Sequence, residues 1–240
     1  MRGGFRHAHY SSTVCTTWLY RGDNRKDLMR QNRIRCRRQH RTRRQGDPHM
    51  SEQISAIDPA RTALIVMHYQ TDILGLFPSV APSLLANTRT LCDAARAKGV
   101  GVFFVNLRFG PGYPEVSRLN KNGQEIKRLG LFTGDETAPE LAQRADEPLV
   151  IAHRASVFFN TDLDVRLSAQ GIDTLIMAGI ASTGVVLSSV AYASDADFCL
   201  YTVKDCCYDP DQVVHEHLFS TAFESRTTVL SLADALLLLG

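Results

Sequence analysis

The sequence predicts an α/β fold: a three-layer, doubly wound sheet of about six mainly parallel strands. Short apolar runs alternate along the chain with segments of helical periodicity, as expected for repeated β-α units. The runs are continuous rather than alternating in polarity, which is typical of parallel strands covered on both faces. The 240 residues, 44% of them apolar and 22% charged, suffice for one domain with a substantial core.

Six apolar runs are the expected strands, and all of them follow residue 58. They cover residues 62–68, 100–106, 149–152, 174–178, 199–203 and 227–230. Between them, helical patterns are expected over residues 82–98, 161–171, 183–196, 209–223 and 232–239.

Start and stop signals delimit several of these helices. Pro82 lies near the first turn of one helix and Gly99 follows its last residue. Leu84, Thr88, Leu91 and Ala95 share its inner face. Thr161 is the expected cap of the next helix, with Asp162 and Asp164 in its first turn and Gly171 after its end. Asp209-Pro210 is expected to open the helix that reaches Phe223.

A segment of about forty residues, 107–147, interrupts this alternation. It contains the run Gly110-Pro111-Gly112-Tyr113-Pro114, and short helices are expected near 124–129 and 139–144. Long insertions of this kind usually form a lid or a partner surface.

Charge divides the chain into two expected regions, a basic extension at 1–49 and a folded domain at 50–240. The first 49 residues hold 13 Lys/Arg and 3 Asp/Glu, for a net charge of +10, and the remainder has a net charge of −8. Seven of the twelve residues from 33 to 44 are Arg, so this extension is expected to be disordered. Nucleic-acid or anionic-lipid binding and organelle targeting are possible roles. The favoured interpretation is that the working protein begins at Met50.

Several classes of protein are excluded by composition. No stretch reaches the ~18 apolar residues of a membrane helix, and six Cys are too few for a disulfide scaffold. No C-x-x-C spacing occurs, and His215 and His217 should face different ways on their helix, so we expect no metal site and no cofactor. We expect a cytoplasmic protein with reduced thiols and no membrane partner.

Ligands of doubly wound sheets bind where the strands end at their carboxyl edge. The strongest candidate among these strand ends is the run of small residues from Gly179 to Val185, just before a helix. Free N–H groups at the start of that helix could bind an anion. The candidate pocket residues are Asn106, Arg108, Tyr113, Phe158, Ile180, Ser182 and Thr183. Arg108 could anchor a carboxylate, although a solvated loop Arg is the simpler interpretation. For Ser182 and Thr183 we prefer helix capping to nucleophilic catalysis.

Three motifs carry a resemblance to a known family. The stretch ALIVMHYQTD (63–72) resembles an opening strand that normally ends V-D-x-Q-N-D. The stretch AHRASVFFNTDL (152–163) resembles K-x-R-x-S-A-F-x-G-T-D-L, and GIASTGVV (179–186) resembles G-x-A-T-x-x-C-V. Together they resemble the isochorismatase-like hydrolases, which include nicotinamidases and N-carbamoyl amide hydrolases.

The resemblance implies a parallel sheet, a dimer or tetramer of identical chains, and a catalytic Asp, Lys and Cys. His68, Ala152 and Val185 stand at those three positions. The family's oxyanion hole would be formed by the backbone of Ala181 and Val185. Since Val185 has no nucleophilic atom and Ala152 cannot transfer a proton, the family's thioester route is excluded in this alignment. Cys206 and Cys207 are expected to be buried, inert thiols rather than a relocated nucleophile.

Two classes of function remain open. One is a hydrolase of a small carbonyl, amide or vinyl-ether compound with a rebuilt site around His68, whose ordinary pKa suits acid–base chemistry. The other is a catalytically inactive family member that binds a small molecule or a partner through the same pocket. A nucleic-acid role of the basic extension is a third possibility.

Overall fold

The structure, a computed structural model, describes residues 57–134 and 136–240. The predicted basic extension at 1–49, its disorder and the start at Met50 lie outside the described residues.

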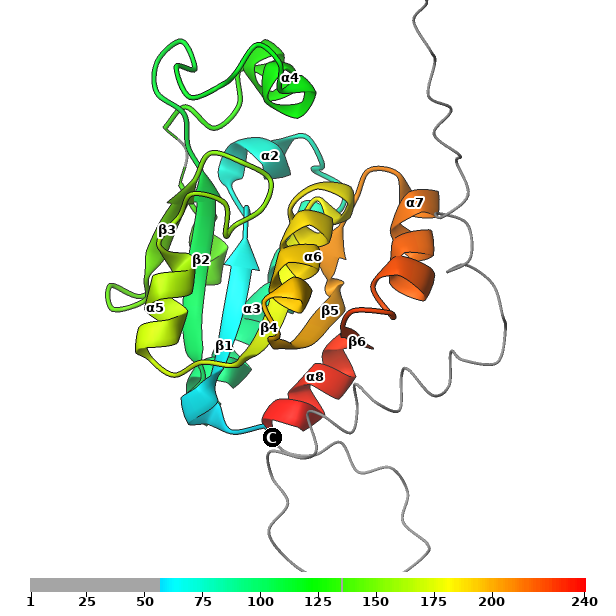
Figure 1. Ribbon diagram of the computed structural model, residues 1–240. Coiled ribbons are helices and arrows are strands. Elements are labelled where there is room, and N and C mark those ends of the chain that lie inside the picture. Colours follow the sequence, from blue (N-terminus) through cyan, green and yellow to red (C-terminus); the bar gives the residue numbers. More distant parts are fainter. Residues whose placement is uncertain (1–56, 135) are drawn as a thin grey trace, which may run out of the picture. The chain divides into compact units, whose positions relative to one another are not determined.

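Six strands form a single, entirely parallel sheet in the order β3-β2-β1-β4-β5-β6 (Figure 1). Their bounds are β1 (Thr62–Met67), β2 (Gly101–Leu107), β3 (Leu149–Ala152), β4 (Thr174–Ile180), β5 (Cys199–Tyr208) and β6 (Thr228–Leu230). The strand order reverses between β1 and β4, which places the switch point of the doubly wound sheet beside the carboxyl end of β1. The predicted fold class is confirmed.

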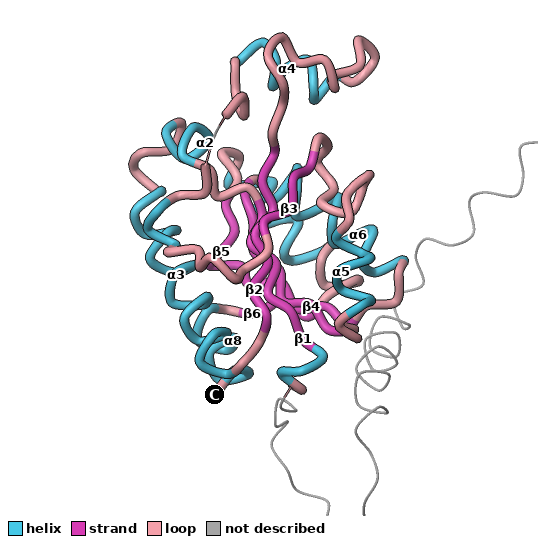
Figure 2. Tube along the Cα trace, turned by 90° about the vertical axis from the view of Figure 1, so that its left-hand side faces the viewer, coloured by secondary structure: helices cyan, strands magenta, loops and turns pink. Residues whose placement is uncertain are grey.

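Helices cover both faces of the sheet. The α-helices are α2 (Thr71–Gly75), α3 (Ala81–Lys98), α4 (Lys121–Leu129), α5 (Leu163–Ala169), α6 (Leu187–Asp195), α7 (Gln212–His217) and α8 (Leu232–Leu239). The described residues also form the 3-10 helices η1 (Pro59–Arg61) and η2 (Pro139–Leu141) and the π-helical turns η3 (Ser182–Val186) and η4 (Leu218–Ala222). Figure 2 shows α3 and α8 on one side of the strands and α5 and α6 on the other.

The strands are continuous apolar runs because helices cover both of their faces. In β1, Ala63, Ile65 and Met67 belong to the apolar cluster on the α5–α6 face. Leu64 and Val66 belong to the cluster on the α3–α8 face. Every residue of the strand is buried, so polarity cannot alternate along it.

Helix α3 agrees closely with the sequence prediction. It begins at Ala81 with a proline in its first two positions and ends at Lys98. Gly99 follows as the C-cap, and its φ of 80° lies in the left-handed region that glycine adopts freely. Leu84, Thr88, Leu91 and Ala95 are all buried. The predicted inner face of this helix is therefore confirmed.

Three predicted helix starts are wrong. Helix α5 begins at Leu163 with Asp162 as its N-cap, one residue after Thr161. The Thr161 hydroxyl donates to the carbonyl of Val157 at 2.6 Å and accepts from the N–H of Leu163 at 3.4 Å. Helix α7 begins at Gln212, where the Asp211 side chain accepts from the N–H of Val214 at 3.0 Å. The helix expected from residue 183 starts as the π-helical turn η3, and α-helical geometry begins only at Leu187.

The predicted strand 199–203 is five residues too short. Beyond Val203, β5 continues to Tyr208, and Gly179 and Ile180 of β4 pair with Cys207 and Tyr208 after a shift in register. Lys204 and Asp205 end the apolar run without ending the strand. Backbone pairing with β4 resumes past them.

The insertion 107–147 rises from the carboxyl end of β2, carries α4 beyond the strand ends and returns to β3 (Figure 1). A buried ion pair holds its returning end, with Nε of Arg96 in α3 2.6 Å from Oε1 of Glu147. Arg96 also donates to the carbonyl of Ala142 at 3.1 Å. The two ends of the segment are thus fixed to the domain, with α4 between them.

Candidate active site at the carboxyl edge of the sheet

The three residues that the motifs place at the family's catalytic positions all lie at the carboxyl edge. His68 directly follows β1, Ala152 is the last residue of β3, and Val185 lies in η3 after β4. The intervening β2 connects the first two, because the N–H of His68 donates to the Val105 carbonyl at 2.8 Å and Ala152 pairs with Leu107. Adjacent strand ends therefore gather the three positions.

His68 is the only one of the three with a titratable side chain, and it is 3% exposed. Its φ of 61° places it in the left-handed region, which histidine enters more readily than most residues. Its Nε2 is buried and has no hydrogen-bond partner in the described part of the chain. The ring of Phe132 lies beside it, with ring centroids 6.4 Å apart. Desolvation lowers the pKa of His68 to about 3, so the imidazole is neutral at physiological pH.

Ala152 and Val185 make the other two positions apolar. Both are buried in the cluster on the α5–α6 face, together with Met67 and Phe132. A Cβ added at Gly179 would lie 3.1 Å from Cγ1 of Val185 and from Cβ of Met67. The absence of a side chain at Gly179 is therefore what lets the valine pack directly on the sheet.

Gln70 and Asp72 hold the segments around His68 in place. The sequence alone indicated no role for either residue. The Gln70 amide donates to the Leu107 carbonyl at 2.9 Å and accepts from the Leu107 N–H at 2.7 Å. A carboxylate oxygen of Asp72 accepts from the N–H of Phe132 at 2.6 Å. Asp72 thereby holds the segment that brings Phe132 next to His68. Both belong to the motif HYQTD, and their place in this motif was the sequence feature that could have identified them.

A second polar cluster lies where β4 and β5 end. Oγ of Ser182 is 2.9 Å from Nδ1 of His215, and both side chains are buried. The N–H and the hydroxyl of Thr183 donate to Oδ2 of the buried Asp209 at 2.8 and 2.6 Å. The expectation that one of the two hydroxyls caps the helix is wrong. The negative charge at this helix start comes instead from Asp209 on a neighbouring segment.

His215 and His217 do face different ways, as predicted. His215 is buried and its ring lies 4.7 Å from that of Phe219, whereas His217 is exposed. Burial lowers the pKa of His215, and the neighbouring charges of Glu216 and Lys204 oppose one another. Ser182 is buried and its hydroxyl already has His215 as a partner, so we interpret the pair as a structural contact.

Several candidate pocket residues already have partners within the protein. The Asn106 amide donates to the Thr137 hydroxyl at 2.9 Å, and the Tyr113 hydroxyl donates to the Leu131 carbonyl at 2.8 Å. Phe158 stacks on Tyr192, and Ile180 is buried on the α3–α8 face, away from Val185. Arg108 is exposed, with its N–H bound to the Ala152 carbonyl at 3.1 Å. Of the five candidate pocket residues in this paragraph, four are buried and only Arg108 is exposed.

Phe103, Phe104 and Phe158 are buried, whereas Phe159, next to Phe158 in the chain, is 52% exposed.

The two adjacent cysteines are free and buried on opposite faces of the sheet. Burial raises the pKa of Cys207 to about 12 and that of Cys206 further still. The expected burial is confirmed, and a thiol that is protonated at neutral pH is a poor nucleophile.

Among the described residues, no three His, Cys, Asp or Glu side chains are close enough together to hold a metal ion. No helix in the same ranges combines the length and the apolar content needed to cross a membrane.

Known proteins share both the sequence pattern and the fold. The family model of the isochorismatase domain matches residues 62–234. The ureidoacrylate amidohydrolase RutB of Agrobacterium fabrum is 30% identical over 177 residues, covering 63% of this chain and 78% of the relative. The uncharacterized isochorismatase family protein YwoC of Bacillus subtilis is 28% identical over 182 residues, covering 72% and 93%.

Solved structures agree at the level of the fold. An isochorismatase family protein from Burkholderia thailandensis superimposes with a TM-score of 0.67 at 23% identity, covering 78% of this chain and 99% of that one. The N-carbamoylsarcosine amidase from Thermoplasma acidophilum has a TM-score of 0.60 at 22% identity, covering 72% and 96%. Since the family model spans most of the domain and the fold is shared, the chain belongs to the isochorismatase family of hydrolases.

Proposed function

We propose that this family member binds a small carbonyl, amide or vinyl-ether compound at the carboxyl edge of the sheet, without forming a covalent intermediate with it. The observation that carries the proposal is the buried, unpartnered Nε2 of His68. A buried polar atom without a partner costs free energy, and a ligand that supplies the missing hydrogen bond would recover it.

The side chains of the site limit which chemical groups of a ligand can bind there. A neutral imidazole gives or accepts one hydrogen bond at Nε2, depending on its tautomer. Either a carbonyl oxygen or an amide N–H therefore matches it. The apolar side chains of Ala152, Val185 and Phe132 favour a compact, uncharged group beside the ring.

The triad alignment argues against the family's covalent route. In the alignment by motifs, His68, Ala152 and Val185 replace Asp, Lys and Cys, so the nucleophile is absent. The low pKa of His68 makes it a weak base for activating water. The geometry therefore favours binding without turnover, and hydrolysis by direct attack of water is the alternative.

A ligand panel tests the proposal. Small amides, carbamoyl compounds and vinyl ethers are incubated with the full chain, unfolding temperature is measured, and mass spectrometry follows each compound and the protein mass. We expect at least one compound to raise the unfolding temperature without being consumed. The variant His68→Phe, which keeps a ring but removes both nitrogens, should lose that response. His217→Phe, at an exposed position, should retain it.

Two results would overturn the proposal. A covalent adduct or consumption of a compound that persists in His68→Phe would mean that another residue carries the chemistry. An equal rise in unfolding temperature in the wild type and in His68→Phe would mean that the ligand binds elsewhere. Consumption that His68→Phe abolishes, with no adduct on the wild type, would select direct hydrolysis over binding alone.

A further inference from the structure

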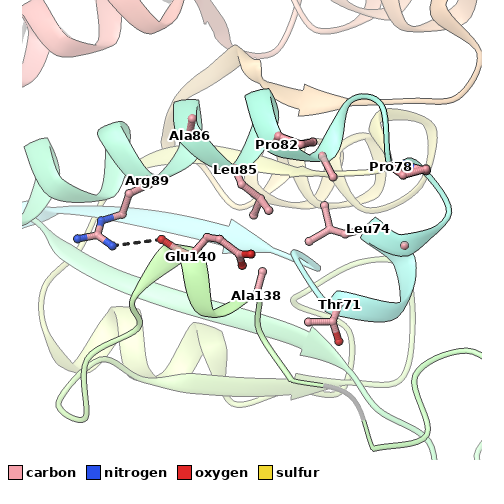
Figure 3. A pocket seen from close by; sticks show the side chains of 11 residues that line it. Thr71, Leu74, Pro78, Pro82, Leu85, Ala86, Arg89, Ala138 and Glu140 are labelled. Atoms are coloured by element: carbon pink, nitrogen blue, oxygen red, sulfur yellow. Dashed lines mark hydrogen bonds between the residues drawn. The ribbon is translucent and has the colours of Figure 1, made fainter.

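A groove on the other face of the sheet is separate from this site. It has a volume of about 590 Å³ and lies between α2, the first half of α3 and the segment that carries η2 (Figure 3). Its residues Leu74, Leu85 and Ala138 belong to the α3–α8 cluster, whereas Ala152 and Val185 belong to the opposite one. The volume falls within the range of about 300–1,000 Å³ that is typical of small-molecule sites.

The walls of the groove are mostly apolar. Side chains that line it include Leu74, Pro78, Pro82, Leu85, Ala86 and Ala138. They come from three segments and face one another across the groove in Figure 3. Two of the six are prolines and two are alanines, so little side-chain rotation is lost when a ligand enters.

One end of the groove carries two charged side chains, Arg89 and Glu140, and among the described residues only the arginine has hydrogen-bond partners for its charged group. The Arg89 guanidinium donates from Nε to Oδ2 of Asp93 at 2.7 Å and from Nη1 to the carbonyl of Glu140 at 3.1 Å. The Glu140 carboxylate has no hydrogen-bond or ion-pair partner within the ranges that the structure describes. In Figure 3 it extends over the apolar lining near Leu85 and Ala138. The groove therefore presents an unpaired negative charge beside an apolar wall.

We propose that this groove binds a small organic cation with an apolar body, whose ammonium group pairs with Glu140. The apolar body covers the wall formed by α2 and α3. An organic anion would be repelled by the carboxylate, and a neutral compound of the same shape would lack the ion pair.

Three naphthyl compounds of matched shape test this proposal on the full chain by isothermal titration. They are 2-(1-naphthyl)ethylamine, 2-(1-naphthyl)ethanol and 3-(1-naphthyl)propionate. We expect one site per chain and an affinity order of amine, then alcohol, then carboxylate. Glu140→Gln should weaken the amine roughly fivefold and leave the alcohol unchanged, as for a partly exposed ion pair.

Two further variants control for general effects. Glu224→Gln removes a carboxylate that is also exposed but lies outside the groove, and it should leave amine binding unchanged. Ala86→Phe fills the groove from an exposed helix position and should abolish binding of all three compounds.

Three results would contradict the proposal. Equal affinities of the amine and the alcohol would show that Glu140 recognises nothing. Amine binding that survives Ala86→Phe would place the ligand outside the groove. Light scattering that shows a dimer in the wild type and a monomer in Ala86→Phe would show that a second copy covers the groove. None of these results depends on His68, so the groove and the site at the carboxyl edge fail or stand separately.

Discussion

Two buried histidines at the carboxyl edge of the sheet have opposite surroundings. His215 is bonded to Ser182 at 2.9 Å and packs on Phe219. His68 is also buried but its Nε2 has no partner in the described residues. Burial lowers the pKa of both rings. The two rings therefore share burial and a lowered pKa and differ in their hydrogen bonding, and the proposed role of His68 rests on that difference.

The largest expected effect is a difference in stability between matched substitutions. His215→Phe leaves the buried Ser182 hydroxyl without its partner and should lower the free energy of unfolding by about 2–3 kcal/mol. His68→Phe removes an unpartnered nitrogen and should change it by less than about 1 kcal/mol in either direction. Urea unfolding at pH 7.5 measures both. Equal losses would mean that His68 also has a structural partner, and the comparison would fail.

The next effect is the dependence of stability on pH. The pKa of His68 is about 3 in the folded state and about 6.5 in the unfolded chain, so between these values the unfolded state binds more protons. Stability from the neutral ring is fully present above pH 6.5 and is lost as the pH falls toward 3. Between pH 7.5 and 5.0 the wild type should lose about 2 kcal/mol more than His68→Phe.

The difference between the two proteins isolates His68, since the other titrating groups are common to both. Urea unfolding at the two pH values measures it. Parallel losses in the wild type and the variant would show that the folded protein holds His68 with a nearly ordinary pKa.

The histidine comparison also shows what sequence could and could not predict. Motifs and strand ends predicted that His68, Ala152 and Val185 lie at one edge, since His68 and Ala152 end apolar runs and Val185 lies in the short segment after a third run. They could not predict that Nε2 of His68 lacks a partner in the described part of the chain. Nor could they predict that Phe132, 64 residues away in the insertion and held there by Asp72, lies beside the ring. Long-range packing of this kind leaves no periodic signal in the chain.

The Ser182–His215 contact was missed for a different reason. The polar pair Lys204-Asp205 ended the predicted strand at Val203, so the pairing of Gly179 with Cys207 was not foreseen. That pairing brings the residues after β4 next to those after β5. Backbone pairing with β4 sets the length of β5. A prediction from side-chain polarity alone makes the strand too short.

The smallest expected effect concerns the charges around His215. Nζ of Lys204 lies 2.6 Å from Oε2 of Glu216, and the Glu216 carboxylate raises the pKa of His215 while Lys204 lowers it. Because this ion pair is exposed, Glu216→Gln should leave the urea midpoint at pH 7.5 unchanged within the precision of the measurement. It should lower the pKa of His215, since the charge that stabilises the imidazolium is gone. Titration by NMR of the His215 ring protons measures this shift. A large fall in the urea midpoint would mean that the ion pair, rather than Ser182 and Phe219, holds His215 in place.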